Sequence, residues 1–158
     1  MSLTKVKKAV PVKKTVFSPS VGKTTVYQNG FESPEYKGTP YSGKGAYLLE
    51  GNGKYKQFRI GLKLEKNRRY RIPFAIRKDF DCSPVGHKTM ACVGNYTKDR
   101  KLERYLMLAG NIRPDGRYHL AAGEFRTSDK LYDCALYFYN RDSHGKICID
   151  DIVIEEIR

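Results

Sequence analysis

Short apolar runs with a two-residue period recur from residue 24 to the end of the printed sequence. Turn-forming residues bound each run, and this combination is typical of β-strands. The expected strands cover residues 24–32, 45–51, 56–64, 68–78, 88–96, 104–112, 118–126, 134–140 and 146–157. Only residues 99–110 could compete as a helix. Many short strands at this spacing predict an all-β fold, an antiparallel β-sandwich or barrel.

Two of these strands indicate which side chains share a face of a sheet. In residues 68–78, one face holds Tyr70, Ile72, Phe74 and Ile76, and the other holds Arg69, Arg71, Pro73, Ala75 and Arg77. In residues 134–140, one face holds Cys134, Leu136 and Phe138, and the other holds Ala135, Tyr137 and Tyr139. Burial of the more apolar face of each strand turns the arginines and tyrosines outward. If both strands lie in one sheet, these residues form a basic aromatic platform; otherwise they are ordinary solvent-facing residues.

The last expected strand contains two adjacent carboxylates, Asp150 and Asp151, inside an apolar run. Aspartate is depleted in strands, and its burial without a partner is costly. The alternation also changes phase here, because Ile147 and Ile149 fall in one phase and Ile152 and Ile154 in the other. A β-bulge at the aspartate pair explains this change of phase, and a nearby group should neutralise the carboxylates.

The sequence has 158 residues, of which 40% are hydrophobic, and this is enough for one domain with a core. No apolar run is long enough to span a membrane. The formal net charge is +13. Residues 1–23 hold six lysines and no acid, and we expect a basic linker or edge extension there. Residues 54–78 hold ten lysines and arginines against one glutamate. Such a patch indicates an anionic partner or a solvated strand face.

No arrangement of side chains supports catalysis, so we expect a protein that is not an enzyme. His87, His119 and His144 are isolated, without the spacing of a metal-binding or nucleophile motif. The four cysteines lack a zinc-ligand spacing. Cys82 and Cys92 could form a disulfide in an oxidising compartment, but free thiols are the simpler expectation.

The chain resembles carbohydrate-binding modules of the galactose-binding-like jelly-roll type, the group that includes families four, nine and twenty-two. The motifs that carry the resemblance occur in order: "VYQNGFES" at 26–33, "YSGKGAYLLEG" at 41–51, "DGRYHLAAGEFRT" at 115–127 and "KICIDDIVIEE" at 146–156. The resemblance covers residues 24–158 and implies one jelly-roll β-sandwich domain. The chain departs from the family in having no tryptophan and in its basic segment.

The resemblance further implies a structural calcium ion between the first and last strands. Its ligands would be the carboxylates of Glu32 and Asp150 with backbone carbonyls near Lys44. Calcium takes six to eight oxygen ligands of these kinds. Alternatively, Glu32 and Asp150 accept hydrogen bonds from a lysine or from backbone amides.

By this resemblance, we expect a non-catalytic module that binds a polysaccharide or oligosaccharide, with an acidic glycan favoured by the basic segment. Tyr137, Tyr139, Arg69, Arg71 and Arg77 are the candidate ligand-binding residues, because rings stack on sugars and arginines bind carboxylates or sulfates. A covalently linked catalytic domain and an extracellular or periplasmic location are also implied. The alternatives are a ligand-free structural spacer and, with less support, a basic nucleic-acid-binding domain.

Overall fold

The computed structural model describes residues 23–141 and 144–158, and its regular elements are β-strands apart from one short 3-10 turn, η2. The strands are β1 (Lys23–Asn29), β2 (Tyr47–Glu50), β3 (Lys56–Leu62), β4 (Arg69–Arg71), β5 (Phe74–Lys78), β6 (Ala91–Tyr96), β7 (Leu102–Leu108), β8 (Tyr118–Ala121), β9 (Glu124–Arg126), β10 (Asp133–Asn140), β11 (Lys146–Asp150) and β12 (Ile152–Ile157). The 3-10 turn η2 covers Gly86–Lys88. The expected linker at residues 1–23 lies outside the described residues, except that β1 begins at Lys23. No helix in the described ranges is long and apolar enough to cross a membrane.

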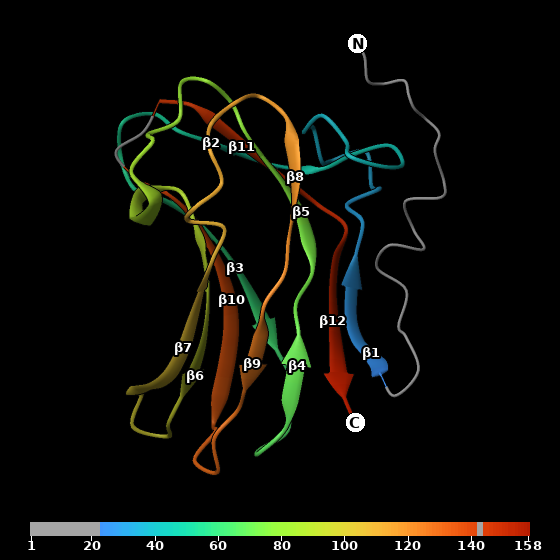
Figure 1. Ribbon diagram of the computed structural model, residues 1–158, viewed down its shortest axis with the longest axis vertical. Coiled ribbons are helices and arrows are strands. Elements are labelled where there is room, and N and C mark those ends of the chain that lie inside the picture. Colours follow the sequence, from blue (N-terminus) through green and yellow to red (C-terminus); the bar gives the residue numbers. More distant parts are fainter. Residues whose placement is uncertain (1–22, 142–143) are drawn as a thin grey trace.

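The strands form the two layers of an antiparallel β-sandwich (Figure 1). One layer is the four-stranded sheet β3-β10-β6-β7. The other layer consists of two four-stranded ladders, β1-β12-β4-β9 and β2-β11-β5-β8. Hydrogen bonds join these ladders end to end, from Val153 N–H to the Pro73 carbonyl at 3.1 Å and from Ile72 N–H to the Gly123 carbonyl at 2.9 Å. The expected all-β sandwich is therefore confirmed.

The break between β11 and β12 lies at the aspartate pair. Asp151 has a φ of 49°, in the left-handed region that is uncommon for a residue other than glycine. This kink changes the phase of the strand, so Ile149 and Ile152 both point into the core and are 0% exposed. The bulge predicted from the change of phase is confirmed.

The core lies between the layers, where the predicted apolar faces meet. Tyr70, Ile72, Phe74 and Ile76 are each at most 1% exposed. From the opposite layer, Leu136 and Phe138 are buried to the same degree, and the rings of Phe74 and Phe138 meet edge to face with their centroids 5.2 Å apart. This packing fixes which side of each strand faces outward.

Two sequence-based alternatives are decided by the strand pairing. Residues 102–108 form the edge strand β7, paired with β6, rather than a helix. The basic segment 54–78 does not form one patch, because it contributes β3 to one layer and β4 and β5 to the other.

All four cysteines are free thiols, and Cys134 is buried in phase with Leu136 as its position in the alternation predicts.

Candidate functional site: a row of tyrosines on one sheet

The outward side chains of β10 form the centre of the candidate site. Because Cys134, Leu136 and Phe138 point into the core, Tyr137 and Tyr139 point outward, and both are half-buried. In the register of the sheet, Tyr137 stands between Arg59 on β3 and Cys92 on β6. The outward orientation predicted for the two tyrosines is confirmed.

Four tyrosines line up across this outer face, and we call Tyr55, Tyr139, Tyr137 and Tyr96 the tyrosine row. The centroids of the Tyr137 and Tyr139 rings are 6.0 Å apart, and the ring planes differ by only 6°. Tyr55 continues the row beyond Tyr139 at 5.7 Å, and Tyr96 continues it beyond Tyr137 at 6.4 Å. Alternation alone predicts only the central pair, since Tyr55 precedes β3 and Tyr96 belongs to β6.

Small residues lie beside the tyrosines in this sheet. Gly61, Ala135 and Gly94 lie opposite one another on β3, β10 and β6. A Cβ atom on Gly94 would lie 3.1 Å from Cε2 of Tyr96 and 2.9 Å from Cδ1 of Leu102. The absence of that atom lets the Tyr96 ring lie close to the strand.

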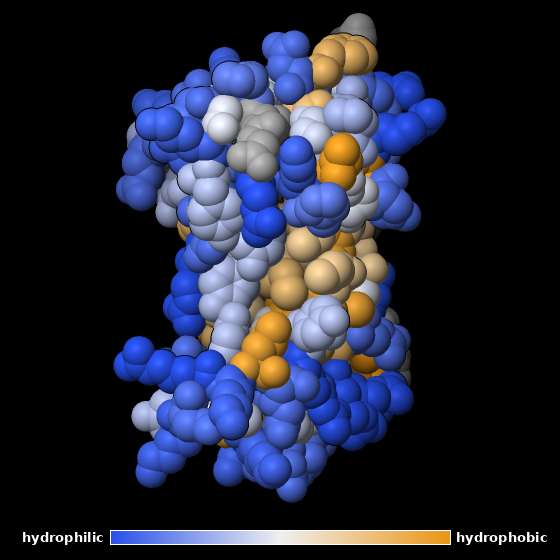
Figure 2. All heavy atoms as spheres, turned by 90° about the vertical axis from the view of Figure 1, so that its left-hand side faces the viewer, coloured by the Kyte–Doolittle hydropathy of each residue, from blue (hydrophilic) through white to orange (hydrophobic). Residues whose placement is uncertain are grey.

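Exposed apolar side chains extend the face towards the edge of the sheet. Tyr105 and Met107 on β7 are 57% and 56% exposed. Figure 2 shows the side of the molecule on which β6 and β7 lie in Figure 1. Pale and orange side chains gather at the middle of this side, between hydrophilic regions at the two ends. A contiguous exposed apolar area of this kind indicates an interaction surface.

Two arginines accompany the tyrosine row. The Arg59 guanidinium lies 5.7 Å from the centroid of the Tyr137 ring and forms an ion pair with Asp133 at 3.1 Å. The Arg141 guanidinium lies 5.2 Å from the centroid of Tyr55 and 5.8 Å from that of Tyr139. Within residues 23–141 and 144–158, no carboxylate pairs with Arg141. Arg141 therefore presents a positive charge at one end of the row.

Burial raises the pKa of three phenol groups of the row, those of Tyr55, Tyr96 and Tyr139. Burial, followed by the nearby Cys92 thiol, raises the pKa of Tyr139 to about 12. Burial also raises the pKa of Tyr96, with a further contribution from its contact with Tyr137. These three phenols therefore stay protonated at neutral pH and can both donate and accept hydrogen bonds, as recognition of sugar hydroxyls requires.

The arginines predicted to join these tyrosines lie elsewhere, and this expectation is wrong. Arg69 and Arg71 belong to β4 in the opposite layer, where Arg71 pairs with Glu155 at 3.6 Å. Arg77 on β5 donates from Nε to the Gly116 carbonyl at 2.6 Å. The reason is strand pairing: β10 lies between β3 and β6, so Arg59 takes the place expected for Arg69 and Arg71.

The predicted calcium ligands lie around the loop 41–45. Asp150 is 0% exposed, and its Oδ2 accepts hydrogen bonds from the amides of Tyr41 at 2.8 Å and Ser42 at 3.1 Å. Its Oδ1 accepts from the Asp151 amide at 2.8 Å. Burial, with the adjacent Asp151 charge, raises the pKa of Asp150 to about 8. Thus amides alone solvate this carboxylate, and no lysine or arginine of the described ranges forms an ion pair with it.

Glu32 binds the same loop from the other side. Its Oε1 accepts hydrogen bonds from the amides of Lys44 at 3.0 Å and Gly45 at 3.3 Å. No group of three or more His, Cys, Asp or Glu side chains in the described part of the chain is arranged to hold a metal ion. The two carboxylates fit a calcium ion in donor type, but such an ion would need backbone carbonyls to complete its shell.

No protein-family model matches this chain, and no curated protein matches it in sequence. Solved structures do match its fold. The N-terminal tandem of two CBM22 domains from Paenibacillus barcinonensis Xyn10C matches at a TM-score of 0.64 and 12% identity, over 89% of this chain and 47% of that one. A family 16 carbohydrate-binding module matches at a TM-score of 0.55 and 16% identity, over 84% of both chains.

The enzymatically active domain of tailspike protein 4 from bacteriophage CBA120 matches at a TM-score of 0.59 and 12% identity. That match covers 85% of this chain but only 19% of the tailspike chain, so the chain spans about a fifth of its length. This protein therefore has the jelly-roll fold that carbohydrate-binding modules share. The resemblance drawn from the sequence is confirmed for the fold, and family twenty-two is represented among the similar structures.

Proposed function

We propose that this domain is a non-catalytic carbohydrate-binding module that holds a glycan on the tyrosine row. The observation that carries the proposal is the row itself: four neighbouring tyrosine rings, with centroids 5.7 to 6.4 Å apart, on the outer face of one sheet. Aromatic faces stack on the apolar faces of sugar rings, and the phenol hydroxyls reach the sugar hydroxyls at the ring edges. The fold shared with two carbohydrate-binding modules supports the same conclusion.

We infer that the preferred glycan is acidic. The chain carries a formal charge of +13, and Arg141 stands over one end of the row without a carboxylate partner in the described ranges. A guanidinium binds a carboxylate or sulfate through paired hydrogen bonds, which a neutral sugar cannot offer.

The similar regions in the tailspike and Xyn10C structures are parts of longer chains. By analogy we propose a secreted parent protein with a linked catalytic domain, and a structural calcium ion at Glu32, Asp150 and the carbonyls near Lys44.

The test is a glycan array followed by titration calorimetry on Tyr137→Ala. Loss of one stacking ring should weaken binding about fivefold, since an aromatic contact contributes about 1 kcal/mol beyond area burial. The melting temperature should change little, because the ring is only half-buried outside the core. Leu120→Ala is the control, since Leu120 is 49% exposed on β8 of the opposite layer. Binding unaffected by Tyr137→Ala would contradict the assignment of this face, and a domain that binds no glycan would support a structural spacer.

A further inference from the structure

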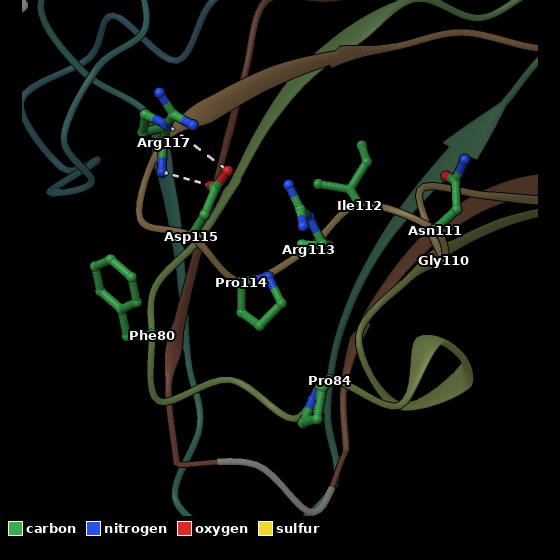
Figure 3. A pocket seen from close by; sticks show the side chains of 9 residues that line it. All are labelled: Phe80, Pro84, Gly110, Asn111, Ile112, Arg113, Pro114, Asp115 and Arg117. Atoms are coloured by element: carbon green, nitrogen blue, oxygen red, sulfur yellow. Dashed lines mark hydrogen bonds and ion pairs between the residues drawn. The ribbon is translucent and has the colours of Figure 1, made fainter.

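A pocket of about 530 Å³ lies between two loops at one end of the sandwich (Figure 3). Phe80 and Pro84 line it from the segment between β5 and β6, and residues 110–115 line it from the segment between β7 and β8. The loops touch through glycines, because a Cβ atom on Gly86 would lie 2.5 Å from the Gly110 carbonyl oxygen. This pocket lies off the tyrosine row, and nothing in the proposed function uses it.

Cationic groups dominate the pocket. The Arg113 side chain is exposed there and has no hydrogen-bond or ion-pair partner among the residues that the structure describes. Arg117 approaches Asp115, with 3.7 Å between Nε and Oδ2. His119 also contacts that carboxylate, at 2.9 Å from its Nε2. Asp115 is thus already engaged, while Arg113 offers a complete set of donors to a ligand.

A further cation lies behind the pocket wall. Lys78 is 1% exposed, and its Nζ donates to the carbonyl of Ala109 at 2.8 Å, next to the pocket residue Gly110. No carboxylate pairs with Lys78 in the described ranges. In this low-dielectric setting its charge acts on the pocket more strongly than it would through water. Among the residues that line the pocket, Arg113 and Arg117 are cationic and Asp115 is the acidic one, while Lys78 adds a buried cation next to Gly110.

An aromatic ring completes the pocket. Phe80 is 78% exposed, although phenylalanine is usually buried. Its ring packs over the backbone at Gly116, where a Cβ atom would lie 2.9 Å from Cε2 of Phe80. Figure 3 shows the Phe80 ring and the side chains of Arg113, Pro114 and Asp115 arranged around the same space. The Phe80 ring and the Arg113 guanidinium line the same pocket. Together they suit a ligand that has both a hydrophobic face and a negative charge.

We propose that this pocket is a second ligand subsite, which binds an anionic sugar residue through Arg113 and Phe80. The sugar ring packs on Phe80, and its carboxylate or sulfate accepts hydrogen bonds from the Arg113 guanidinium. The proposal rests on the proposed function, because it adds this pocket to Arg141 at the end of the tyrosine row as a second source of the preference for acidic glycans.

The backbone connects the two sites. The Arg141 amide donates to the Lys88 carbonyl at 2.7 Å, and the Tyr139 amide donates to the Met90 carbonyl at 2.8 Å. The segment between β5 and β6 therefore borders the Arg141 end of the tyrosine row and also supplies Phe80 and Pro84 to the pocket. A glycan chain that engages both sites gains avidity from their linkage.

The experiment compares three oligosaccharide probes by calorimetry: a galacturonate hexamer, its neutral methyl ester, and a sulfated dextran oligomer. Arg113→Gln should weaken the binding of the acidic probes about tenfold, as expected for loss of a charge-assisted hydrogen bond, and leave the methyl ester within twofold. Phe80→Ala should weaken all three. The sulfated and carboxylated probes together identify which anion the pocket accepts. Arg126→Gln is the matched control, since Arg126 is an exposed arginine on β9 of the opposite layer.

The outcomes separate this inference from the proposed function. If Tyr137→Ala weakens all probes while Arg113→Gln leaves the preference for acid unchanged, the pocket assignment is overturned and the module assignment stands. If no oligosaccharide binds, the proposed function fails, and a titration of free galacturonate monitored by NMR tests the pocket alone. Amide shifts confined to residues 80–88 and 110–117 would support the pocket, and their absence at millimolar galacturonate would overturn it. Thermal melts of each variant exclude loss of folding as the cause.

Discussion

At the scale of single residues, the least expected feature is a set of ionisable groups held inside an apolar sandwich. Lys78 is fully buried with one carbonyl as its partner, and Asp150 is fully buried with three amides as its partners. Burying a charge is costly unless it is paired, and burial accordingly shifts the pKa of both groups towards the neutral form. Both side chains lie beside loops that line a candidate site, which is where such costs are commonly tolerated.

Lys78 gives a prediction on pH. Burial lowers the pKa of its ammonium group from 10.5 to about 8. Between about pH 8 and 10.5 the folded protein therefore binds fewer protons than the unfolded chain, and the contribution of Lys78 to the free energy of unfolding rises with pH in that range. Below pH 8 the penalty of burying the charge is fully present.

Lys78→Met removes this titration. The melting temperature of the variant minus that of the wild type should be largest near pH 7 and should decrease between pH 8 and 10. Loss of the hydrogen bond to Ala109 adds an offset that does not depend on pH. Lys146→Met, at an exposed position on β11, serves as the control. Thermal melts across this range measure the difference, and a constant difference would refute the lowered pKa.

At the scale of elements, loop 41–45 holds together the segment that follows β1 and the end of β11. Glu32 follows β1, Asp150 ends β11, and both carboxylates accept hydrogen bonds from amides of this loop. The close approach is visible at Gly43, whose φ is +67° and where a Cβ atom would overlap the Glu32 carboxylate. Both carboxyl groups meet at one loop, and neither forms an ion pair with a cationic side chain of the described residues, which is why the calcium ion proposed above is assigned to this loop.

The calcium proposal predicts a change in stability on chelation. Removal of calcium with EDTA at pH 7.5 should lower the melting temperature, and excess calcium should restore it by ordinary ligand linkage. The response should disappear in Asp150→Asn and remain in Asp129→Asn, because Asp129 is an exposed carboxylate without a side-chain hydrogen bond or ion pair in the described part of the chain. Differential scanning calorimetry measures the shift. An unchanged melt after exhaustive chelation would rule out a stabilising ion at this loop.

At the scale of the whole molecule, the positive charge of residues 54–78 is spread over both layers rather than gathered on one face. The basic segment 54–78 supplies β3 to one layer and β4 and β5 to the other, and several of its arginines pair with carboxylates. A nucleic-acid-binding surface needs a continuous track of unpaired cations along the ligand. The arrangement favours local recognition of a few anionic groups instead.

Salt dependence tests this distinction on the intact domain. Between 50 and 500 mM NaCl, binding of a neutral oligosaccharide should stay constant, since stacking on tyrosines does not involve ions. Binding of the galacturonate hexamer should fall with a logarithmic slope of about one or two, corresponding to one or two ion contacts. Calorimetry at four salt concentrations gives the slope. Tight binding of single-stranded DNA with a much steeper slope would favour the nucleic-acid alternative.

The sequence by itself determined the features that depend on local alternation. The outward tyrosines of residues 134–140, the buried set Tyr70, Ile72, Phe74 and Ile76, and the bulge at Asp150 and Asp151 all follow from which positions of a strand must be apolar. The order of the motifs was also sufficient for the jelly-roll fold. These features were predictable because side-chain direction in a strand has a period of two residues.

Only the tertiary structure decided which strands lie side by side. β10 pairs with β3 and β6, so Arg59 accompanies Tyr137, while Arg69 and Arg71 lie in the opposite layer. The additions of Tyr55 and Tyr96 to the site, and the pocket at Phe80 and Arg113, likewise join segments that are distant in the sequence. Local alternation carries no information about partners, because strand pairing is selected by burial of the whole core.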